Sequence, residues 1–164
     1  MDDSRFWLLV DAAKAQAGAH PQARPPALRA ALAGLATTDI QSFQRTYDRM
    51  RQRANRWDLR SAAELMLGRR SDAGFHAFLD WLISEGRDGY ERALADPDSL
   101  ADVPVDGDCE LDAFGDAALD AYAEHTDKPL ECDRPEDGVP PDGHVLNEAE
   151  LAARLPRLIA RYPR

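Results

Sequence analysis

The sequence predicts an all-α protein, a single compact domain of about seven to eight helices that spans residues 1–164. Apolar side chains recur at steps of three and four in several segments, which is the spacing of a helix with one buried face. No segment alternates apolar and polar residues, as a half-buried strand would. With 44% hydrophobic and 30% charged residues, the chain is long enough to bury a core without a metal or a disulfide.

The first three helices are expected in the N-terminal third of the chain. Ser4 is predicted to cap the first helix, which ends at Gly18, and the two prolines at 25–26 suit the first turn of the second. Thr37 or Thr38 is predicted to cap the third helix. Its apolar face is the clearest in the chain and consists of Ile40, Phe43, Tyr47, Met50, Ala54 and Trp57.

A row of arginines lies on the other side of the third helix, because successive residues of a helix turn by about 100°. The apolar pattern loses phase after Trp57, so we expect a bend there and a fourth helix that Asp58 caps and Gly68 ends. We name the row the arginine stripe, which consists of Arg45, Arg49, Arg53, Arg56 and Arg60.

The fifth helix is predicted by the segment GRRSDAGFHAFLDWLISEGR near the middle of the chain. Ser71 or Asp72 is the expected cap, and Gly86 is the expected end. Trp81 lies off the apolar face of this helix, on the same side as Gly74. It either packs in a second buried face or docks a partner, because Trp is favoured in binding hot spots.

The same segment places a serine, a histidine and two aspartates close together, as a catalytic site would. A nucleophile needs a base within hydrogen-bond reach and a third group that orients the base. The side chain of Ser71, however, is committed to the free N–H groups of the first helical turn. We therefore predict no catalytic residue, and we expect His76 to form a surface pair with Asp72 or Asp80, each one turn away.

The second half of the chain contains fewer regular elements. A sixth, shorter helix is expected to end before Pro97. Residues 101–109 are predicted to form a loop, and residues 110–125 a seventh helix. Residues 127–146 hold four prolines and show little periodicity, so they are predicted to form a long acidic loop.

A C-terminal helix is predicted over residues 147–162. Asn147 and Glu150 have the spacing of a capping box, in which each side chain bonds the backbone of the other residue. Pro156 is expected to interrupt or kink this helix, because proline lacks the N–H that the helix needs.

Charge is distributed unevenly along the chain. Residues 96–150 contain 2 basic and 18 acidic side chains, whereas the net charge of the whole chain is −10. Any electrostatic partner is expected to meet this segment. Its most regular feature is the acidic face of the seventh helix, which consists of Asp112, Asp116, Asp120 and Glu124.

The acidic face has three open interpretations. Like charges four residues apart destabilise an isolated helix by a few tenths of a kcal/mol per pair, so a compensating contact is plausible. The face is either solvated, or paired with the arginine stripe, which has a matching spacing, or bound to an external basic partner.

Metal and cofactor motifs are missing from the sequence. The run DGDCELD at 106–112 begins like a calcium loop, but Leu111 and Ala117 stand where that loop needs glycine and glutamate. Cys109, Cys132 and the histidines lack the paired spacing of zinc ligands. We therefore predict no metal and no cofactor.

Composition also limits the partners and the compartment. The acidic start of the chain is unlike a secretory signal, and no apolar run is long enough to span a bilayer, so we expect a cytoplasmic protein that does not enter a membrane. A net charge of −10 makes nucleic acid an unfavourable partner. The oligomeric state stays open.

Residues 56–102 resemble a known signature. They read RWDLRSAAELMLGRRSDAGFHAFLDWLISEGRDGYERALADPDSLAD and are similar to the core of an uncharacterised bacterial family, domain of unknown function 4240. The opening FWLLVDAA is similar to the family's start, so the resemblance runs from about residue 4 to the end and is weakest over residues 101–146. The chain departs from the family's usual tyrosine and glycines at Glu64 and residues 68–70. The residues that carry the resemblance include Trp57, Asp58, Leu59, Ala62, Ala63, Gly68, Ser71, Asp72, Gly74, Phe75, Phe78, Trp81, Leu82, Ile83, Gly86, Arg87, Tyr90, Pro97 and Leu100.

The resemblance implies no reaction. Some relatives stand beside domains linked to regulation, which implies an interaction role by analogy alone. Taken with the missing catalytic motifs, this predicts a non-catalytic domain that binds another protein. One specific version is an acidic inhibitor or immunity-type protein that masks a basic enzyme. The predicted binding residues are Trp57, Trp81, Arg87, Asp58 and Asp72.

Two other functions stay open at this point. One is a small enzyme that uses a cleft of arginines and carboxylates on a phosphorylated or cationic small molecule. The other is RNA binding through the arginine stripe, which requires that stripe to be exposed.

Overall fold

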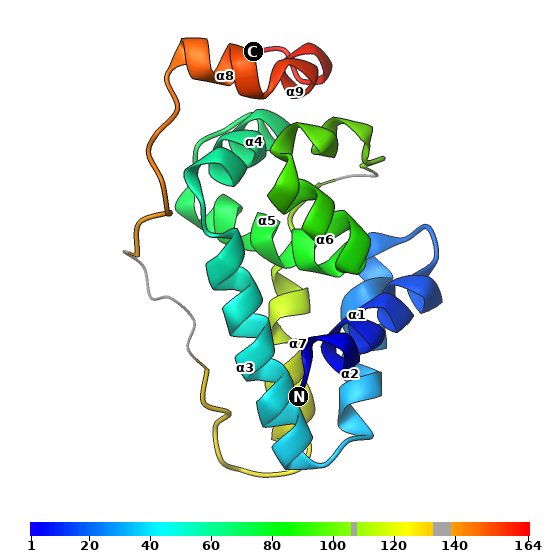
Figure 1. Cartoon of the computed structure of the whole chain (residues 1–164). Coiled ribbons are helices and arrows are strands. Elements are labelled where there is room, and N and C mark those ends of the chain that lie inside the picture. Colours follow the sequence, from blue (N-terminus) through cyan, green and yellow to red (C-terminus); the bar gives the residue numbers. More distant parts are fainter. Residues whose placement is uncertain (106–107, 133–138) are drawn as a thin grey trace.

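The computed structural model describes residues 1–105, 108–132 and 139–164, and every regular element within these ranges is helical (Figure 1). The all-α prediction is therefore confirmed. The N-terminal elements are α1 (Asp3–Ala17), the 3₁₀ turn η1 (Pro21–Ala23), α2 (Arg24–Ala33) and α3 (Thr37–Ala54). The later elements are α4 (Trp57–Leu67), α5 (Asp72–Ser84), α6 (Gly86–Ala95), η2 (Pro97–Asp102), α7 (Asp112–Ala123), α8 (Glu148–Arg154) and α9 (Pro156–Arg161).

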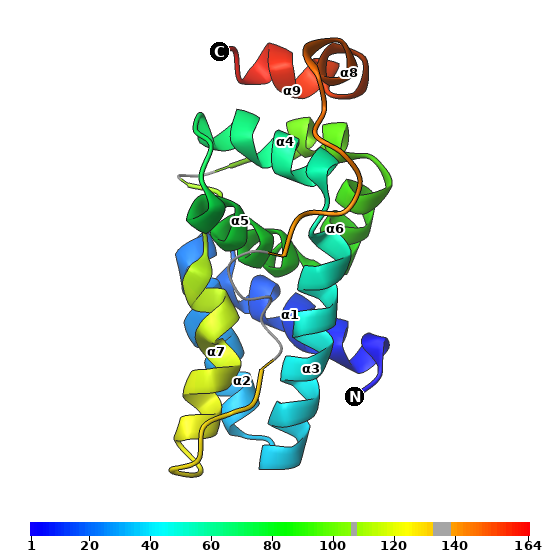
Figure 2. The same ribbon diagram turned by 90° about the vertical axis from the view of Figure 1, so that its left-hand side faces the viewer.

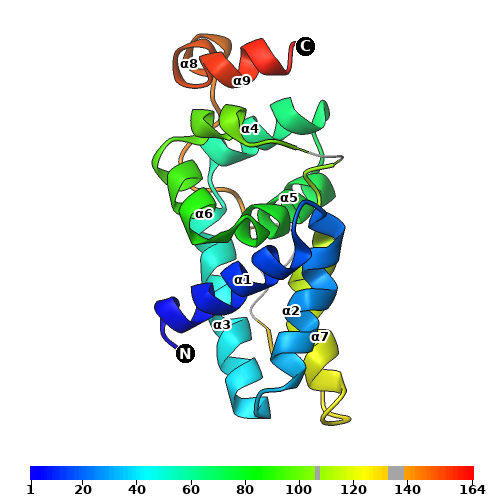
Figure 3. The same ribbon diagram turned by 90° about the vertical axis from the view of Figure 1, so that its right-hand side faces the viewer.

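The long helix α3 and the helices α1, α2 and α7 form one end of the molecule. Helix α2 packs against both α7 and α1, and α1 crosses in front of α3 (Figure 3). Aromatic rings fill the space between these helices, since the ring of Phe6 lies 4.8 Å from that of Phe43 and 6.3 Å from that of Tyr47. The predicted apolar face of α3, from Ile40 to Ala54, is buried here.

Helix α5 lies in the middle of the molecule and contacts helices on several sides. It packs against α7, α6, α3, α4 and α1. Trp81 is 1% exposed and its ring lies 5.4 Å from that of Phe78. Trp81 therefore belongs to a second packing face of α5, and in this structure it is not available to a partner.

Several helix starts differ from the predictions. Asp2, not Ser4, caps α1 by accepting the N–H of Arg5. Helix α3 begins at Thr37 without a side-chain cap, because the cap position holds Ala36. Asp58 lies inside the first turn of α4 and does not cap it.

Other helix boundaries follow the sequence closely. Ser71 caps α5 through a 3.0 Å hydrogen bond from the N–H of Gly74. Gly68 ends α4 in the left-handed conformation, with φ of 69°, which glycine adopts without strain. Both interactions of the capping box join Asn147 and Glu150 at the start of α8.

The C-terminal region differs most from the prediction. The single helix expected over residues 147–162 is two short helices, α8 and α9, because the chain leaves the helical conformation at Leu155 before Pro156. Helix α9 packs on η2, where the carboxylate of Asp98 accepts the N–H groups of Arg157 and Leu158 (Figure 1).

The two predicted loops also need correction. The predicted loop over residues 101–109 begins later, because η2 continues to Asp102. The described parts of the segment 127–146 contain no helix, in agreement with the prediction, whereas residues 133–138 lie outside the described ranges.

Candidate functional site

A buried ion pair joins α3 to α5. Arg51 Nη1 lies 2.5 Å from Asp80 Oδ1, and the hydroxyl of Tyr47 donates to the same oxygen at 2.7 Å. Gly115 of α7 lies directly over this carboxylate, since a Cβ placed on Gly115 would lie 2.7 Å from Asp80 Oδ1. Asp80 is therefore a buried structural residue, and not the surface residue that the predicted pair with His76 assumed.

The sequence contained one signal for this buried pair. Arg51 follows Tyr47 by four residues, so it lies on the buried face of α3 and not on the arginine stripe. A second buried cation, Arg24, donates to the hydroxyl of Ser84 at 3.0 Å and to the carboxylate of Glu85 at 2.7 Å. Neither pair lines the pocket between α4, α5 and the segment that precedes α8.

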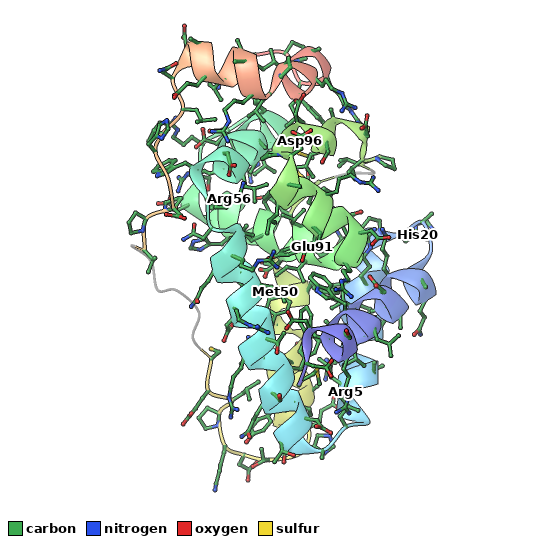
Figure 4. The ribbon with its side chains drawn as sticks, viewed as in Figure 1. Arg5, His20, Met50, Arg56, Glu91 and Asp96 are labelled. Atoms are coloured by element: carbon green, nitrogen blue, oxygen red, sulfur yellow. The ribbon has the colours of Figure 1, made fainter. Side chains whose placement is uncertain are left out.

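Four members of the arginine stripe have acidic partners. Arg49 pairs with Asp3 at 2.5 Å, and Arg53 pairs with Glu91 at 3.0 Å. The hydrogen bonds that Arg53 donates to the carboxylate of Glu91 raise the pKa of Arg53. Figure 4 labels Glu91 on α6 and Met50 on α3, the two helices that this second pair joins. Arg45 is exposed and has no ion pair within the described residues.

The remaining two arginines of the stripe, Arg56 and Arg60, pair with acidic residues on or near α4. The acidic face of α7 makes a different contact. Arg56 pairs with Asp58 at 2.5 Å, and its other terminal nitrogen donates to the carbonyl of Leu94 at 2.9 Å. On α7, Glu124 pairs with Arg29 of α2 at 2.6 Å. Within the acidic face, Asp112 and Asp120 are exposed and Asp116 is half-buried.

A pocket of about 370 Å³ lies between α4, α5 and the segment that precedes α8. Three of the predicted residues meet there, namely Trp57, Arg60 and Asp72. Helices α4 and α5 supply the aromatic rings, whereas residues 139–145 supply valine and proline. We name it the Trp57 pocket; its lining comprises Asn55, Trp57, Arg60, Arg70, Asp72, Phe75, His76, Val139, Pro140, Pro141 and Val145.

Arg60 is held in the wall of the Trp57 pocket from several sides. Its guanidinium lies 5.4 Å from the ring centre of Trp57 and 5.6 Å from that of Phe75, within the range of cation–π attraction. It also pairs with Asp72 at 2.5 Å and with Glu64 at 3.3 Å. The charge of Arg60 is therefore compensated before any ligand arrives.

The rim of the Trp57 pocket is apolar and exposed. Val139 is 57% exposed and Val145 is 53% exposed. Among the described residues, only one other large apolar side chain is exposed to a similar degree, that of Leu8 on α1, which does not line the pocket. Asp72 also lies at the mouth, because its side chain is 76% exposed.

A smaller pocket of about 150 Å³ adjoins the first one and shares Trp57 with it. Asp58 lies there, buried, with Arg56 at 2.5 Å and Arg154 of α8 at 3.4 Å. Arg87 lies elsewhere, at the start of α6, where its backbone N–H donates to Asp11 and its side chain is exposed. The predicted binding residues therefore do not form one site.

Other site chemistry is limited. Within the described ranges, no three His, Cys, Asp or Glu side chains are arranged to hold a metal ion, and the calcium-like run at 106–112 lies partly outside those ranges. Both cysteines are free; burial raises the pKa of the Cys109 thiol to about 12, whereas Cys132 is exposed. No helix in the described part of the chain is long and apolar enough to cross a membrane.

These features define a helical domain with an apolar, arginine-containing pocket, the Trp57 pocket. A family model described as "Protein of unknown function (DUF4240)" matches residues 1–124, and the chain belongs to this family. No curated protein and no solved structure matches the chain. The family match ends just after α7, so the residues of the Trp57 pocket that come from positions 139–145 lie outside it.

Proposed function

We propose that the chain is a non-catalytic protein-interaction domain, and that its contact surface is the Trp57 pocket with its rim. The observation that carries this proposal is the pair of exposed valines, Val139 and Val145, which line the same pocket as the half-buried Trp57. Exposed apolar groups that gather around a concave site are typical of interaction surfaces. Trp57 provides the kind of aromatic anchor on which binding free energy is often concentrated.

The net charge supports a basic partner. With a net charge of −10, the chain attracts cationic proteins over long distances, and salt weakens that attraction. This is the form expected of an acidic inhibitor or immunity-type protein. In this proposal the domain acts in the cytoplasm, and the free cysteines, one of them exposed, are consistent with a reducing compartment.

A capture experiment with matched variants tests the proposal. The wild-type chain, a variant with Val139→Ser and Val145→Ser, and a Leu8→Ser control are immobilised and exposed to the cell extract at low and moderate salt. We expect the wild type and the Leu8→Ser control to retain the same specific protein and the double variant to lose it. Equal retention by all three, or background proteins alone, would contradict the proposed surface.

A second function is favoured by one observation, the convergence of Arg60, Arg70 and Asp72 in the Trp57 pocket. A small enzyme could hold a phosphorylated molecule there, because guanidinium groups bind phosphate well. Glu64 already pairs with both Arg60 and Arg70, however, which lowers the local positive charge. Inorganic phosphate or pyrophosphate should raise the unfolding temperature of the wild type but not of an Arg70→Gln variant if this function is correct.

A further inference from the structure

A short strap crosses the junction of α3 and α4. We define the strap as residues 139–146, which Figure 2 shows in orange beside α4 before α8 begins. The N–H of Trp57 donates to the carbonyl of Asp142 at 3.0 Å, and the N–H of Asp142 donates to the carbonyl of Asn55 at 2.8 Å. Arg56 and Asp142 thus form a single parallel β-bridge.

The strap is held by its backbone more than by its side chains. Residues 139–145 are exposed or half-exposed, and only Leu146 at its end is buried. Two further bonds hold it. The one from the side-chain amide of Asn55 to the carbonyl of Val139 is long at 3.4 Å, and the one between His144 Nε2 and Glu150 Oε1, at 2.9 Å, joins exposed side chains. A segment with few buried apolar contacts and exposed hydrogen bonds opens at a low free-energy cost.

The groups that hold the strap do not depend on its sequence. The N–H of Trp57 belongs to the first turn of α4, where no helical partner exists for it, and the carbonyl of Asn55 lies just after α3. Any extended chain can satisfy both groups, as in recognition modes in which a peptide pairs with an exposed backbone edge. Trp57 and Phe75 lie beside this edge in the pocket wall.

We propose that the α3–α4 junction and the Trp57 pocket form a docking site for an extended, proline-containing apolar segment of a partner, and that the strap occupies this site within the chain. The inference rests on the interaction role of the proposed function, but it places the partner segment on the α4 and α5 walls of the pocket, so that Val139 and Val145 are displaced with the strap. The strap itself supports this proposal. Its sequence at 139–141 is Val-Pro-Pro, and its two prolines line the same pocket as Trp57. Proline-rich extended segments bind aromatic grooves with a small loss of entropy.

Binding of the partner therefore competes with the strap. The strap continues directly into α8, and the buried side chain of Leu151 anchors α8 to the rest of the protein. The strap is therefore always near the docking site, at a high effective concentration. A partner segment binds only the fraction of molecules in which the strap is open, and its apparent affinity is reduced by that fraction.

An added copy of the strap tests this inference without a known partner. The probe is the acetylated and amidated peptide of residues 139–146, and the proteins are the full-length wild type and an Asp142→Pro variant. Proline removes the N–H that donates to Asn55, so the variant frees the site. Binding is followed by NMR through the indole N–H resonance of Trp57, which is assigned by its loss in a Trp57→Phe variant. The other two tryptophans, Trp7 and Trp81, are buried, so their resonances should not respond to the peptide.

We expect the peptide to shift the Trp57 resonance of Asp142→Pro with an affinity at least about tenfold higher than for the wild type. A peptide that carries the same Asp142→Pro change should bind neither protein. Binding of equal strength to both proteins, or no shift in the variant, would overturn the inference. Dimers in which straps are exchanged between two copies would overturn it too, because the occupant would then be a second copy.

A measurement on the wild type covers the case in which Asp142→Pro does not fold. The amide hydrogens of Trp57 and Asp142 should exchange at least about tenfold faster than those in the middle of α3, because the strap opens without global unfolding. Exchange at the rate of the core would show a fixed strap and contradict the inference. The valine variants distinguish the two proposals. Loss of partner capture would support a partner that contacts the strap in place and would contradict displacement, whereas retained or stronger capture would contradict the rim as the contact surface and support displacement.

Discussion

Arg51 and Asp80 form an ion pair whose side chains are 6% and 5% exposed, and the oxygen that receives the arginine also accepts the hydroxyl of Tyr47. Breaking a buried pair by removing one member costs about 3–5 kcal/mol, because the other charge stays buried without compensation. We therefore expect Asp80→Asn to lower the free energy of unfolding by an amount in this range. Urea denaturation followed by circular dichroism measures the change.

A double variant separates the pair from its neighbours. Arg51→Met combined with Asp80→Asn removes both charges, so it should cost clearly less than the sum of the two single changes. Tyr47→Phe, which removes one donor to Asp80, should cost about 1 kcal/mol. Additive effects of the two charge changes would show that the ion pair contributes nothing through mutual attraction.

Gly115 gives a second test of the packing around Asp80. A Cβ at this position would lie 2.7–2.8 Å from the carboxylate atoms of a buried, fixed side chain. Overpacking of this kind lowers the free energy of unfolding by about 1–3 kcal/mol. The better helix propensity of alanine offsets at most about 1 kcal/mol of this loss. We expect Gly115→Ala to lower the denaturation midpoint.

Gly34→Ala is the matched control for this change. Gly34 has φ of −80°, and the nearest atom to an added Cβ is the carbonyl oxygen of Ala31 at 3.7 Å, an ordinary contact. This variant should be neutral or more stable by up to about 1 kcal/mol. If both variants had the same effect, the close approach of α7 to Asp80 would not be the cause.

The sequence predicted the helices well because their signals are local. A serine before an apolar run capped α5, and a glycine ended α4, since both act within one turn. The role of Arg51 was missed, because a helix with arginines on several sides does not show which of them meets a buried acid. That choice depends on α5, which lies about thirty residues away in sequence.

The candidate site was predicted in part for the same reason. Trp57 and Asp72 were singled out by residue type, and the structure brings both to one pocket. Arg87 lies at another surface and Trp81 in the core, which a pattern of residue types cannot distinguish. The strap was beyond prediction, because a backbone pairing of Asp142 with the α3–α4 junction leaves no periodicity in the sequence.

The two cysteines should differ in reactivity. Burial raises the pKa of Cys109 to about 12, and only the thiolate reacts with disulfide reagents. At pH 8, we expect a thiol-specific reagent to modify Cys132 at once and Cys109 about a thousandfold more slowly. Mass spectrometry of the labelled protein, with and without denaturant, measures both rates. Rapid labelling of a Cys132→Ser variant under native conditions would contradict the burial of Cys109.

The capping box of α8 should be destabilised at low pH. The N–H of Asn147 and, next, the side chain of His144 lower the pKa of Glu150, so the folded chain favours the carboxylate. Stability from a lowered carboxyl pKa is complete above the unfolded value, about 4.3, and is lost as the pH falls through the folded value. The protection factor of the Asn147 amide, which is the exchange rate of an unfolded chain divided by the measured rate at the same pH, should therefore decrease below about pH 4.

Two variants show whether Glu150 causes this acid response. Glu150→Gln keeps a weaker acceptor that does not titrate, so the protection factor of the Asn147 amide should be smaller at neutral pH and nearly independent of pH. Glu148→Gln, in the same helical turn but without a bond to Asn147, should retain the wild-type response. An unchanged response in Glu150→Gln would assign the acid sensitivity to another group, because the only titrating partner of the Asn147 N–H would have been removed.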